Sequence, residues 1–95
     1  MIPRMPDSYY AELQVRLRHL LEAVAAQMAA NQVALISGLI DKNELGVALQ
    51  FLSDGLAERR VRLPEAERRE VARLAELMGL DPSVARQVGE QSADL

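Results

Sequence analysis

The sequence predicts a small all-α protein, an antiparallel bundle of four helices followed by a short fifth helix. Three observations predict this fold class. Leu, Ala, Glu and Arg, which favour helices, dominate the composition, whereas β-branched residues are sparse. Apolar residues recur at the spacing of one helix face in several consecutive segments. Polar or proline-containing breaks of a few residues separate the segments, and such short connections make consecutive helices antiparallel neighbours.

The chain of 95 residues has the size of one domain, which we place over residues 1–95. Pro3 and Pro6 prevent a regular helix at the start, so residues 1–7 are predicted to form a loose leader. Residues 91–95 are predicted to be a frayed tail. A domain this small buries only part of its surface, so we expect a thin core and a modest stability.

The first helix is predicted over about residues 8–28, with Asp7 or Ser8 as its N-terminal cap. Its apolar positions follow one face of an α-helix, and they are Leu13, Leu17, Leu20, Leu21, Val24 and Met28. The stretch Ala29-Ala30-Asn31-Gln32 either breaks this helix or only bends it, and the sequence leaves both open. If it breaks, Asn31 could cap a second helix that carries Val33, Ile36, Leu39 and Ile40.

Residues 41–43 form a polar turn, and either Asp41 or Asn43 is predicted to cap the third helix. Glu44 then lies in the first turn, where a negative charge opposes the positive end of the helix dipole. Gly46 and Gly55 indicate close packing of another backbone against this helix, or a frayed end near Gly55. The core stripe is predicted to consist of Leu45, Ala48, Leu49, Leu52 and Leu56.

Residues 59–63 form a connector to the fourth helix, and Pro64 has the fixed φ that suits a first helical position. Gly79 is predicted to end this helix in a left-handed C-cap, with a hydrophobic contact from Leu80 after it. Asp81 then caps a short fifth helix that Pro82 opens. The apolar faces of these two helices are predicted to be Val71, Leu74, Ala75 and Met78, and Val84 and Val88.

The sequence offers little material for catalysis, so we expect no enzyme activity, no metal site and no cofactor. It contains no cysteine, and we interpret its one histidine, His19, as a surface or boundary residue. Glutamates and arginines alternate at helical spacings after Pro64, which is typical of a solvated face with weak ion pairs. The sequence has no glycine-rich phosphate loop, nucleophile elbow or helical zinc-protease motif.

Charge and hydropathy argue against nucleic-acid and membrane partners. The net charge is −3, and the densest basic cluster, residues 59–62, has no aromatic neighbours for base stacking. No stretch reaches the roughly 18 uninterrupted apolar residues of a membrane span. The first residues do not resemble a secretory signal, so we expect a cytoplasmic protein. The pair Tyr9-Tyr10 either anchors an interface or fastens the start of the first helix to the core.

Two segments of the chain each carry a recognisable pattern of apolar positions, acids and a glycine. In the first, a helix ends in Ile40-Asp41, a polar turn follows, and Glu44-Leu45-Gly46-Val47-Ala48-Leu49 continues to Leu52, Asp54 and Leu56. In the second, a connector ending at Leu63 leads to a Glu-rich helix start, then to Leu74 and Leu77-Met78-Gly79-Leu80. Over residues 35–80, the chain resembles the MafI family of immunity proteins. These are small helical proteins that protect a bacterium from polymorphic toxins used in interbacterial competition.

The resemblance implies an immunity protein that binds and neutralises a cognate protein toxin by protein–protein contact. Toxin domains of this kind are often nucleases with basic substrate-binding surfaces, so acidic side chains along a helix would imitate phosphate. Asp41, Glu44, Asp54 and Glu58 lie in or beside the matched segment, and we predict that they bind the partner. Asp54 and Glu58 are four residues apart and therefore share one helix face.

Two other functions stay open at this point. The first is a helical self-association or adaptor module, in which a homodimer completes the burial of a thin core. The second is a helix-turn-helix regulator, which needs a recognition helix with exposed Arg, Asn or Gln side chains. The helix after Pro64 carries arginines, but glutamates balance them.

Overall fold

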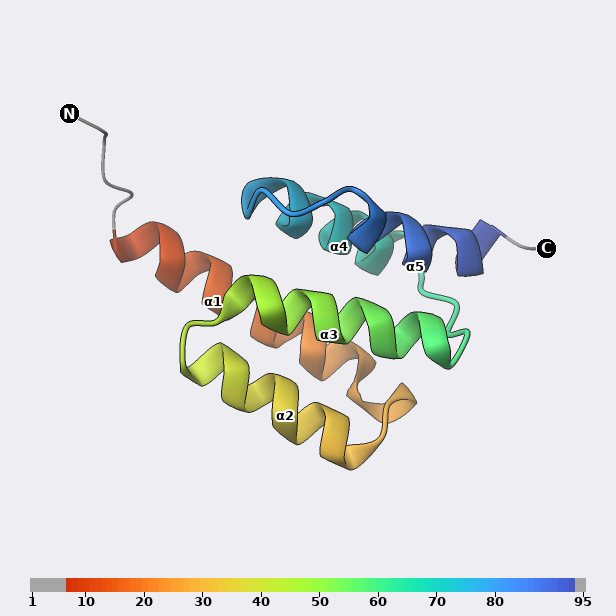
Figure 1. Ribbon diagram of the computed structural model, residues 1–95, viewed down its shortest axis with the longest axis horizontal. Helices are drawn as coiled ribbons and strands as arrows, with labels where there is room; N and C mark the ends of the chain where they lie inside the picture. The colour runs from red at the N-terminus through yellow and green to blue at the C-terminus, as the bar shows by residue number, and fades with distance from the viewer. Residues whose placement is uncertain (1–6, 94–95) are drawn as a thin grey trace.

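The computed structural model describes residues 7–93 as five α-helices and one short 3₁₀ helix, with no strand in that range (Figure 1). The all-α prediction is therefore confirmed. The predicted leader, up to residue 6, and the last two residues of the predicted frayed tail lie outside the described residues. In chain order the elements are α1 (Asp7–Val24), η1 (Ala25–Gln27), α2 (Ala30–Asp41), α3 (Leu45–Glu58), α4 (Glu65–Leu77) and α5 (Ser83–Ala93).

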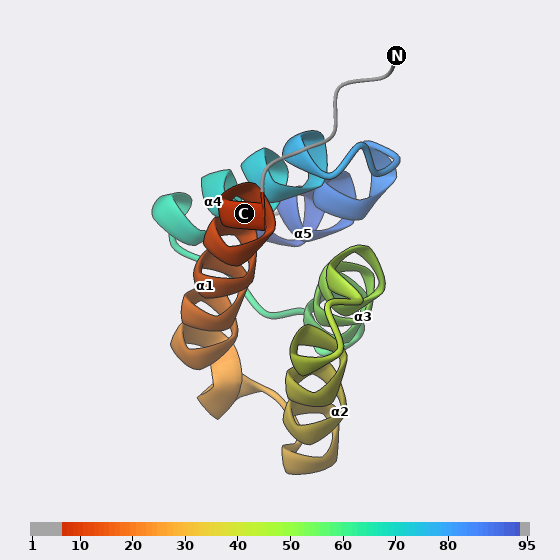
Figure 2. The same cartoon turned by 90° about the vertical axis from the view of Figure 1, so that its left-hand side faces the viewer.

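Helix α3 is the central helix, because it contacts each of the other four α-helices. Figures 1 and 2 together show two layers, with α2, α3 and α5 in one layer and α1 and α4 in the other. Short turns fold α3 back along α2 and α5 back along α4 (Figure 1). None of the helices in the described part of the chain is long and apolar enough to cross a membrane.

The core forms where the apolar faces of the helices meet. Nearly every predicted apolar position is buried, and Val33, Leu39 and Met78 are half-buried at its edge. Leu63 in the connector is buried as well, which closes the core below α4. The side chains buried most completely are Leu17, Ile36, Ile40, Leu49, Leu52, Leu56, Leu74, Val24, Val71 and Val88.

The first helix ends earlier than predicted, so the single helix predicted over residues 8–28 is too long. Helix α1 ends at Val24, η1 follows, and Met28 has an extended backbone (φ −124°, ψ 159°). Asn31 lies inside the first turn of α2 and is therefore not its cap. The N-cap is Ala29, whose backbone N–H donates to Oε1 of Gln32 at 3.4 Å. The break brings Met28 into the core, where its side chain is 7% exposed.

Helices α2, α3 and α4 end in the same type of turn. The residue after each C-cap has a positive φ: Asn43 (60°), Arg60 (53°) and Gly79 (68°). The next backbone N–H then donates to a carbonyl five residues back, which is the Schellman arrangement. These bonds run from Glu44 to Leu39 (2.9 Å), from Val61 to Leu56 (3.0 Å) and from Leu80 to Ala75 (2.9 Å). The predicted stop at Gly79 is confirmed.

The turn before α3 corrects the predicted cap. Asp41 is the last residue of α2, and Asn43 is the left-handed residue of the turn, so neither caps α3. Glu44 occupies the N-cap position and makes no side-chain capping bond. The physical reason is that the end of α2 and the start of α3 compete for the same three residues, and Asn tolerates the left-handed conformation well.

Two glycines in α3 lie against side chains. A Cβ atom added to Gly55, which is buried, would lie 2.8 Å from Cε of Met28. One added to Gly46 would lie 3.3 Å from a methyl group of Leu80. The predicted close packing is therefore present, but the neighbours are side chains rather than another backbone, and Gly55 is not at a frayed end.

The starts of the last two helices are close to those predicted. Pro64 is the N-cap of α4 rather than its first helical residue. At the start of α5, Oδ1 of Asp81 accepts a hydrogen bond from the backbone N–H of Ser83 at 2.9 Å. Asp81 therefore caps this helix through its side chain, as the sequence predicts.

Polar side chains join α1 to its neighbours. Arg16 donates to both carboxylate oxygens of Glu70 in α4, at 3.0 and 2.6 Å, and this hydrogen bonding raises the pKa of Arg16 above its ordinary value. Gln14 donates to the carbonyl of Ile40 at 2.8 Å, which ties α1 to the end of α2. These bonds fix the orientation of α1 against α4 in its own layer and against α2 in the other.

Candidate protein-binding surface

Helix α3 carries a second stripe on the side opposite its core stripe. Residues spaced three or four apart lie on one face of a helix, and this spacing runs from the N-cap to the last residue of α3. Every residue of the stripe is exposed. The middle of the stripe is apolar and both ends are acidic. In order, the outer stripe consists of Glu44, Val47, Phe51, Asp54 and Glu58.

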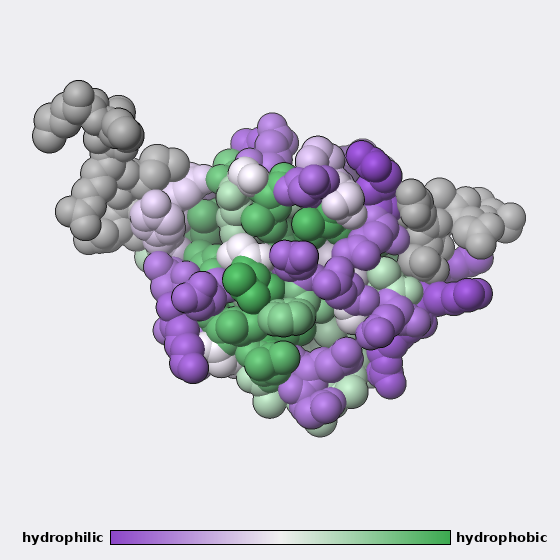
Figure 3. All heavy atoms as spheres, viewed as in Figure 1, coloured by the Kyte–Doolittle hydropathy of each residue, from purple (hydrophilic) through white to green (hydrophobic). Residues whose placement is uncertain are grey.

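Two leucines of α2 lie beside this stripe. A Cβ atom on Gly55 would approach the side-chain amide of Gln32 to 3.4 Å, so these two positions are about level. Since α2 and α3 form a hairpin, Leu35 is then about level with Phe51, and Leu39 with Val47. We call these four side chains, Leu35, Leu39, Val47 and Phe51, the α2–α3 patch. Figure 3 shows hydrophobic side chains gathered over α2 and the first half of α3.

The α2–α3 patch is unusually open for apolar side chains. Leu35 is 54% exposed, Phe51 44% and Val47 42%, whereas Leu39 is half-buried. The other exposed large apolar side chains among the described residues, Tyr10 and Val15, lie on α1. Single exposed apolar residues are ordinary, but a group with a polar rim marks an interaction site.

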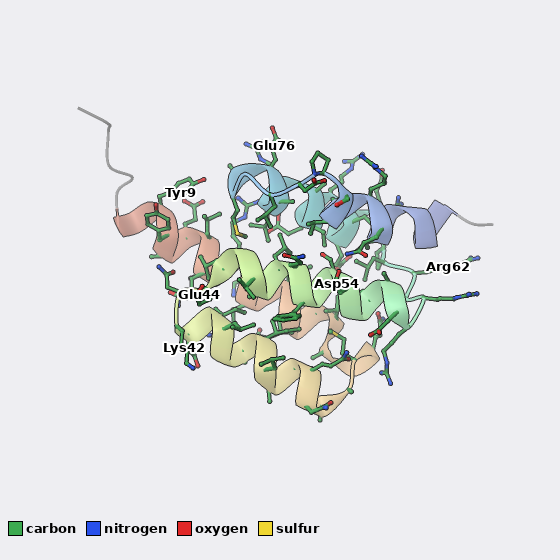
Figure 4. All side chains as sticks on the ribbon, viewed as in Figure 1. Tyr9, Lys42, Glu44, Asp54, Arg62 and Glu76 are labelled. Atoms are coloured by element: carbon green, nitrogen blue, oxygen red, sulfur yellow. The ribbon has the colours of Figure 1, made fainter. Side chains whose placement is uncertain are left out.

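Three of the four predicted partner-binding acids lie on this surface. Glu44 and Asp54 lie at the two ends of the apolar middle of the outer stripe, as Figure 4 shows, and Glu58 follows one turn after Asp54. Oδ1 of Asp54 also accepts a hydrogen bond from the side-chain amide of Gln87 in α5, at 2.7 Å. This contact connects the stripe to α5 and holds the carboxylate in place.

The fourth acid, Asp41, faces a different part of the molecule. Its carboxylate forms an ion pair with Arg18 of α1, and Arg18 also donates to the hydroxyl of Ser37 at 3.2 Å. Asp41 therefore belongs to the α1–α2 junction, and it does not join Glu44, Asp54 and Glu58 on the outer stripe.

The sequence reasoning missed the apolar part of this surface. It assigned Leu39 to the core face of its helix, and it gave no role to Leu35, Val47 or Phe51. A signal was present, because Val47 and Phe51 are four residues apart and lie off the predicted core stripe. Only the neighbouring helix shows that this second stripe is continued by Leu35 and Leu39.

The two tyrosines at the start of α1 have different surroundings. The hydroxyl of Tyr9 donates to the carbonyl of Leu77 at 2.8 Å, and its ring packs against the core. Tyr10 is 42% exposed and meets the Tyr9 ring edge-to-face, with 5.6 Å between the ring centroids. Tyr9 therefore fastens α1 to α4. Beside the tyrosines lies an open hollow of about 300 Å³ that also borders Gly46 and Met78.

The polar side chains elsewhere form surface ion pairs. Glu65 and Arg69 pair at 2.8 Å and Arg73 and Glu76 at 3.5 Å on the exposed face of α4, as the helical spacing predicts. His19 is exposed on α1. Within residues 7–93, no three side chains of the metal-binding types His, Cys, Asp and Glu come together as a possible metal site.

No family model, no curated protein and no solved structure matches this chain.

Proposed function

We propose that this protein acts by binding another protein, and that it is an immunity protein for a bacterial toxin domain. The observation that carries the proposal is the α2–α3 patch, in which the side chains of Leu35, Phe51 and Val47 are each about half exposed. Removing apolar area from water is favourable by about 25 cal/mol per Å². A partner that covers the patch therefore gains binding free energy. The resemblance to the MafI family supplies the class of partner.

The polar rim of the patch supports a protein partner over a small ligand. The hollow next to Asp54, of about 260 Å³, is shallow and is lined by exposed residues such as Gln50 and Arg86. Small-molecule sites enclose most of their ligand, whereas protein interfaces are broad surfaces with an apolar centre and a polar rim. An apolar centre between acidic ends matches the second description. Such a protein would act in the cytoplasm, alongside its toxin.

Co-expression tests this proposal. The partner to use is the C-terminal domain of the large secreted toxin that the proposal expects to be encoded immediately upstream of this chain. We expect that domain to stop the growth of a host cell and this protein to restore growth. We also expect the two chains to co-purify as one complex. Growth arrest that persists when this protein is present at equal or higher amounts would contradict the proposal.

A self-association module is the second candidate, since a further copy of the chain could cover the same patch. Obligate homodimers bury apolar surface much as a domain core does. The oligomeric state of the chain alone separates the two functions. If the patch binds a different protein, sedimentation equilibrium of the chain alone is expected to give the mass of a monomer.

A further inference from the structure

We infer that the α2–α3 patch receives an apolar side chain from a basic protein surface, rather than a second copy of this chain. The inference rests on the proposed function and specifies which surface acts and what chemistry the partner presents. It is carried by the order of residues along the outer stripe, which runs acid, apolar, apolar, acid, acid.

The acidic ends are spaced for contacts on both sides of one apolar group. Helical rise places Asp54 about 15 Å from Glu44 along the axis, and Glu58 about 21 Å from it. Val47 and Phe51 lie between them, with Leu35 and Leu39 alongside. A fitting partner therefore has an exposed Leu, Ile, Met or Phe side chain with Lys or Arg side chains on either side of it, and the cations on the two sides are about 15–21 Å apart.

Basic residues lie near the outer stripe, but none of them belongs to it. All three charged residues of the stripe are acidic. Lys42 lies in the turn before α3 and Arg86 lies across the hollow from Asp54. Arg59 directs its guanidinium to the carbonyl of Gln27 at 3.3 Å, toward the start of α2.

The same order of charges opposes self-association through this patch. A two-fold axis through the middle of Val47 and Phe51 that sets two α3 helices antiparallel brings Glu44 of one copy opposite Asp54 of the other. An axis along α3 sets the helices parallel and brings each acid opposite itself. Both arrangements place like charges together at the rim of an apolar contact, which suppresses pairing. A partner with cations at these positions gains attraction instead.

The contact from Gln87 supports Asp54 as the central charge of the surface. The hydrogen bond of 2.7 Å holds the Asp54 carboxylate beside Phe51, one helical turn away, before any partner arrives. A charged group that is already held in place loses less conformational entropy on binding than a free side chain does.

The test uses the toxin domain identified by the co-expression experiment above, and measures its association rate and affinity at low and at high salt. Phe51→Ala is expected to weaken binding by about tenfold or more, since aromatic anchors dominate interface energetics. Asp54→Lys combined with Glu58→Lys is expected to slow association by about tenfold at low salt and by less at high salt. All three residues are exposed, so these variants are expected to fold.

Two controls make changes of the same kind on other faces of the molecule. Val15→Ala truncates an apolar residue of α1 that is somewhat more exposed than Phe51. Glu22→Lys combined with Glu76→Lys reverses two exposed acids, one on α1 and one on α4, and Figure 4 shows Glu76 well away from the outer stripe. Both controls are expected to bind like the original protein.

The possible outcomes separate this inference from the proposed function. If Phe51→Ala and the double variant of Asp54 and Glu58 bind as well as the controls, the inference is overturned while the proposed function stands. An original protein that does not bind the toxin domain at all would overturn both. Sedimentation of the chain alone that shows a dimer, dissociated by Phe51→Ala but not by Val15→Ala, would assign the patch to a second copy and overturn the inference. Carbodiimide cross-linking is expected to join Asp54 or Glu58 to a lysine of the partner.

Discussion

Arg60 shows how a single backbone conformation stores unfavourable energy in this protein. It follows the end of α3 with a φ of 53°, in the left-handed region where a Cβ atom is crowded. The two equivalent turns place Asn43 and Gly79 at this position, both of which tolerate it better. The Schellman bond from Val61 to Leu56 holds Arg60 in this conformation.

We predict that Arg60→Gly stabilises the protein by about 0.5–1 kcal/mol, because glycine adopts a positive φ without the Cβ clash. Arg59→Gly is the control. Its φ is −88°, so glycine there relieves no strain, adds freedom to the unfolded chain and removes the hydrogen bond from Arg59 to Gln27, and it is expected to destabilise. Urea unfolding of both variants measures the two changes. Destabilisation by Arg60→Gly would contradict the strain assigned to this residue.

Ser53 is the other residue whose chemistry conflicts with its surroundings. Its side chain lies fully buried in α3, and among the described residues its hydroxyl is the buried side-chain group without a hydrogen-bond partner. A buried hydroxyl that is not hydrogen-bonded loses its interactions with water and gains nothing in return.

Ser53→Ala is therefore predicted to raise the free energy of unfolding by about 1 kcal/mol. Ser37→Ala is the matched change, and it is expected to lower stability slightly because the Ser37 hydroxyl accepts a hydrogen bond from Arg18. Equilibrium unfolding distinguishes the two. Equal losses in both variants would show that the Ser53 hydroxyl finds a partner in solution.

At the scale of elements, α5 depends on one side chain for its start. Hydrogen bonds from the backbone N–H and the side chain of Ser83 lower the pKa of Asp81 from its ordinary value of 3.8. Because the folded-state pKa is the lower one, the capping contribution is complete above 3.8. It is lost as the pH falls through the folded-state value.

We expect amide-exchange protection at the start of α5 to weaken as the pH is lowered below the ordinary Asp81 pKa. Asp81→Asn keeps an acceptor for the Ser83 N–H but does not titrate, so this pH dependence should disappear. Exchange measured by NMR on both proteins checks this. If the two proteins respond to acid in the same way, the Asp81 carboxylate is not what governs the start of α5.

At the scale of the whole molecule, the fold separates the core from the surface that we propose binds a partner. The inner stripe of α3 lies in the core, where Leu49 is fully buried, and the outer stripe bears the α2–α3 patch. Since the two stripes use opposite faces of one central helix, changes to the outer stripe can leave packing intact. The Arg16–Glu70 ion pair is a minor contribution by comparison, because both side chains are about one third exposed.

This separation predicts different responses to truncation. Leu49→Ala is expected to cost about 2–5 kcal/mol of stability, as large-to-small changes in a core do. Leu35→Ser and Phe51→Ser are each expected to cost about 1 kcal/mol or less, because these side chains keep near half of their surface in water. Thermal and urea unfolding measure all three. If Phe51→Ser lowers the free energy of unfolding as much as Leu49→Ala does, Phe51 stabilises the fold like a core residue and this prediction is wrong.

Much of the fold follows from the sequence alone. Helical spacing of leucines predicted the core stripes of α1 and α3, and Gly79 predicted the end of α4, because these features depend on neighbours within a few residues. The sequence left a break or a bend at residues 29–32 open, but it did not predict that α1 ends as early as Val24, where Met28 turns into the core beside Gly55 of another helix. The same is true of Asn43, which takes the left-handed position after the C-cap of α2 and therefore does not cap α3.

For the candidate site, spacing along one helix fixes which side chains of α3 share its outer face, although only the acids of that face were predicted to bind a partner. The sequence placed Asp54 and Glu58 together for this reason. Only the tertiary structure decided that Asp41 turns to Arg18 and that Leu35 and Leu39 extend the stripe into a patch. Those relations join residues of different helices, and the packing of one helix against another sets them.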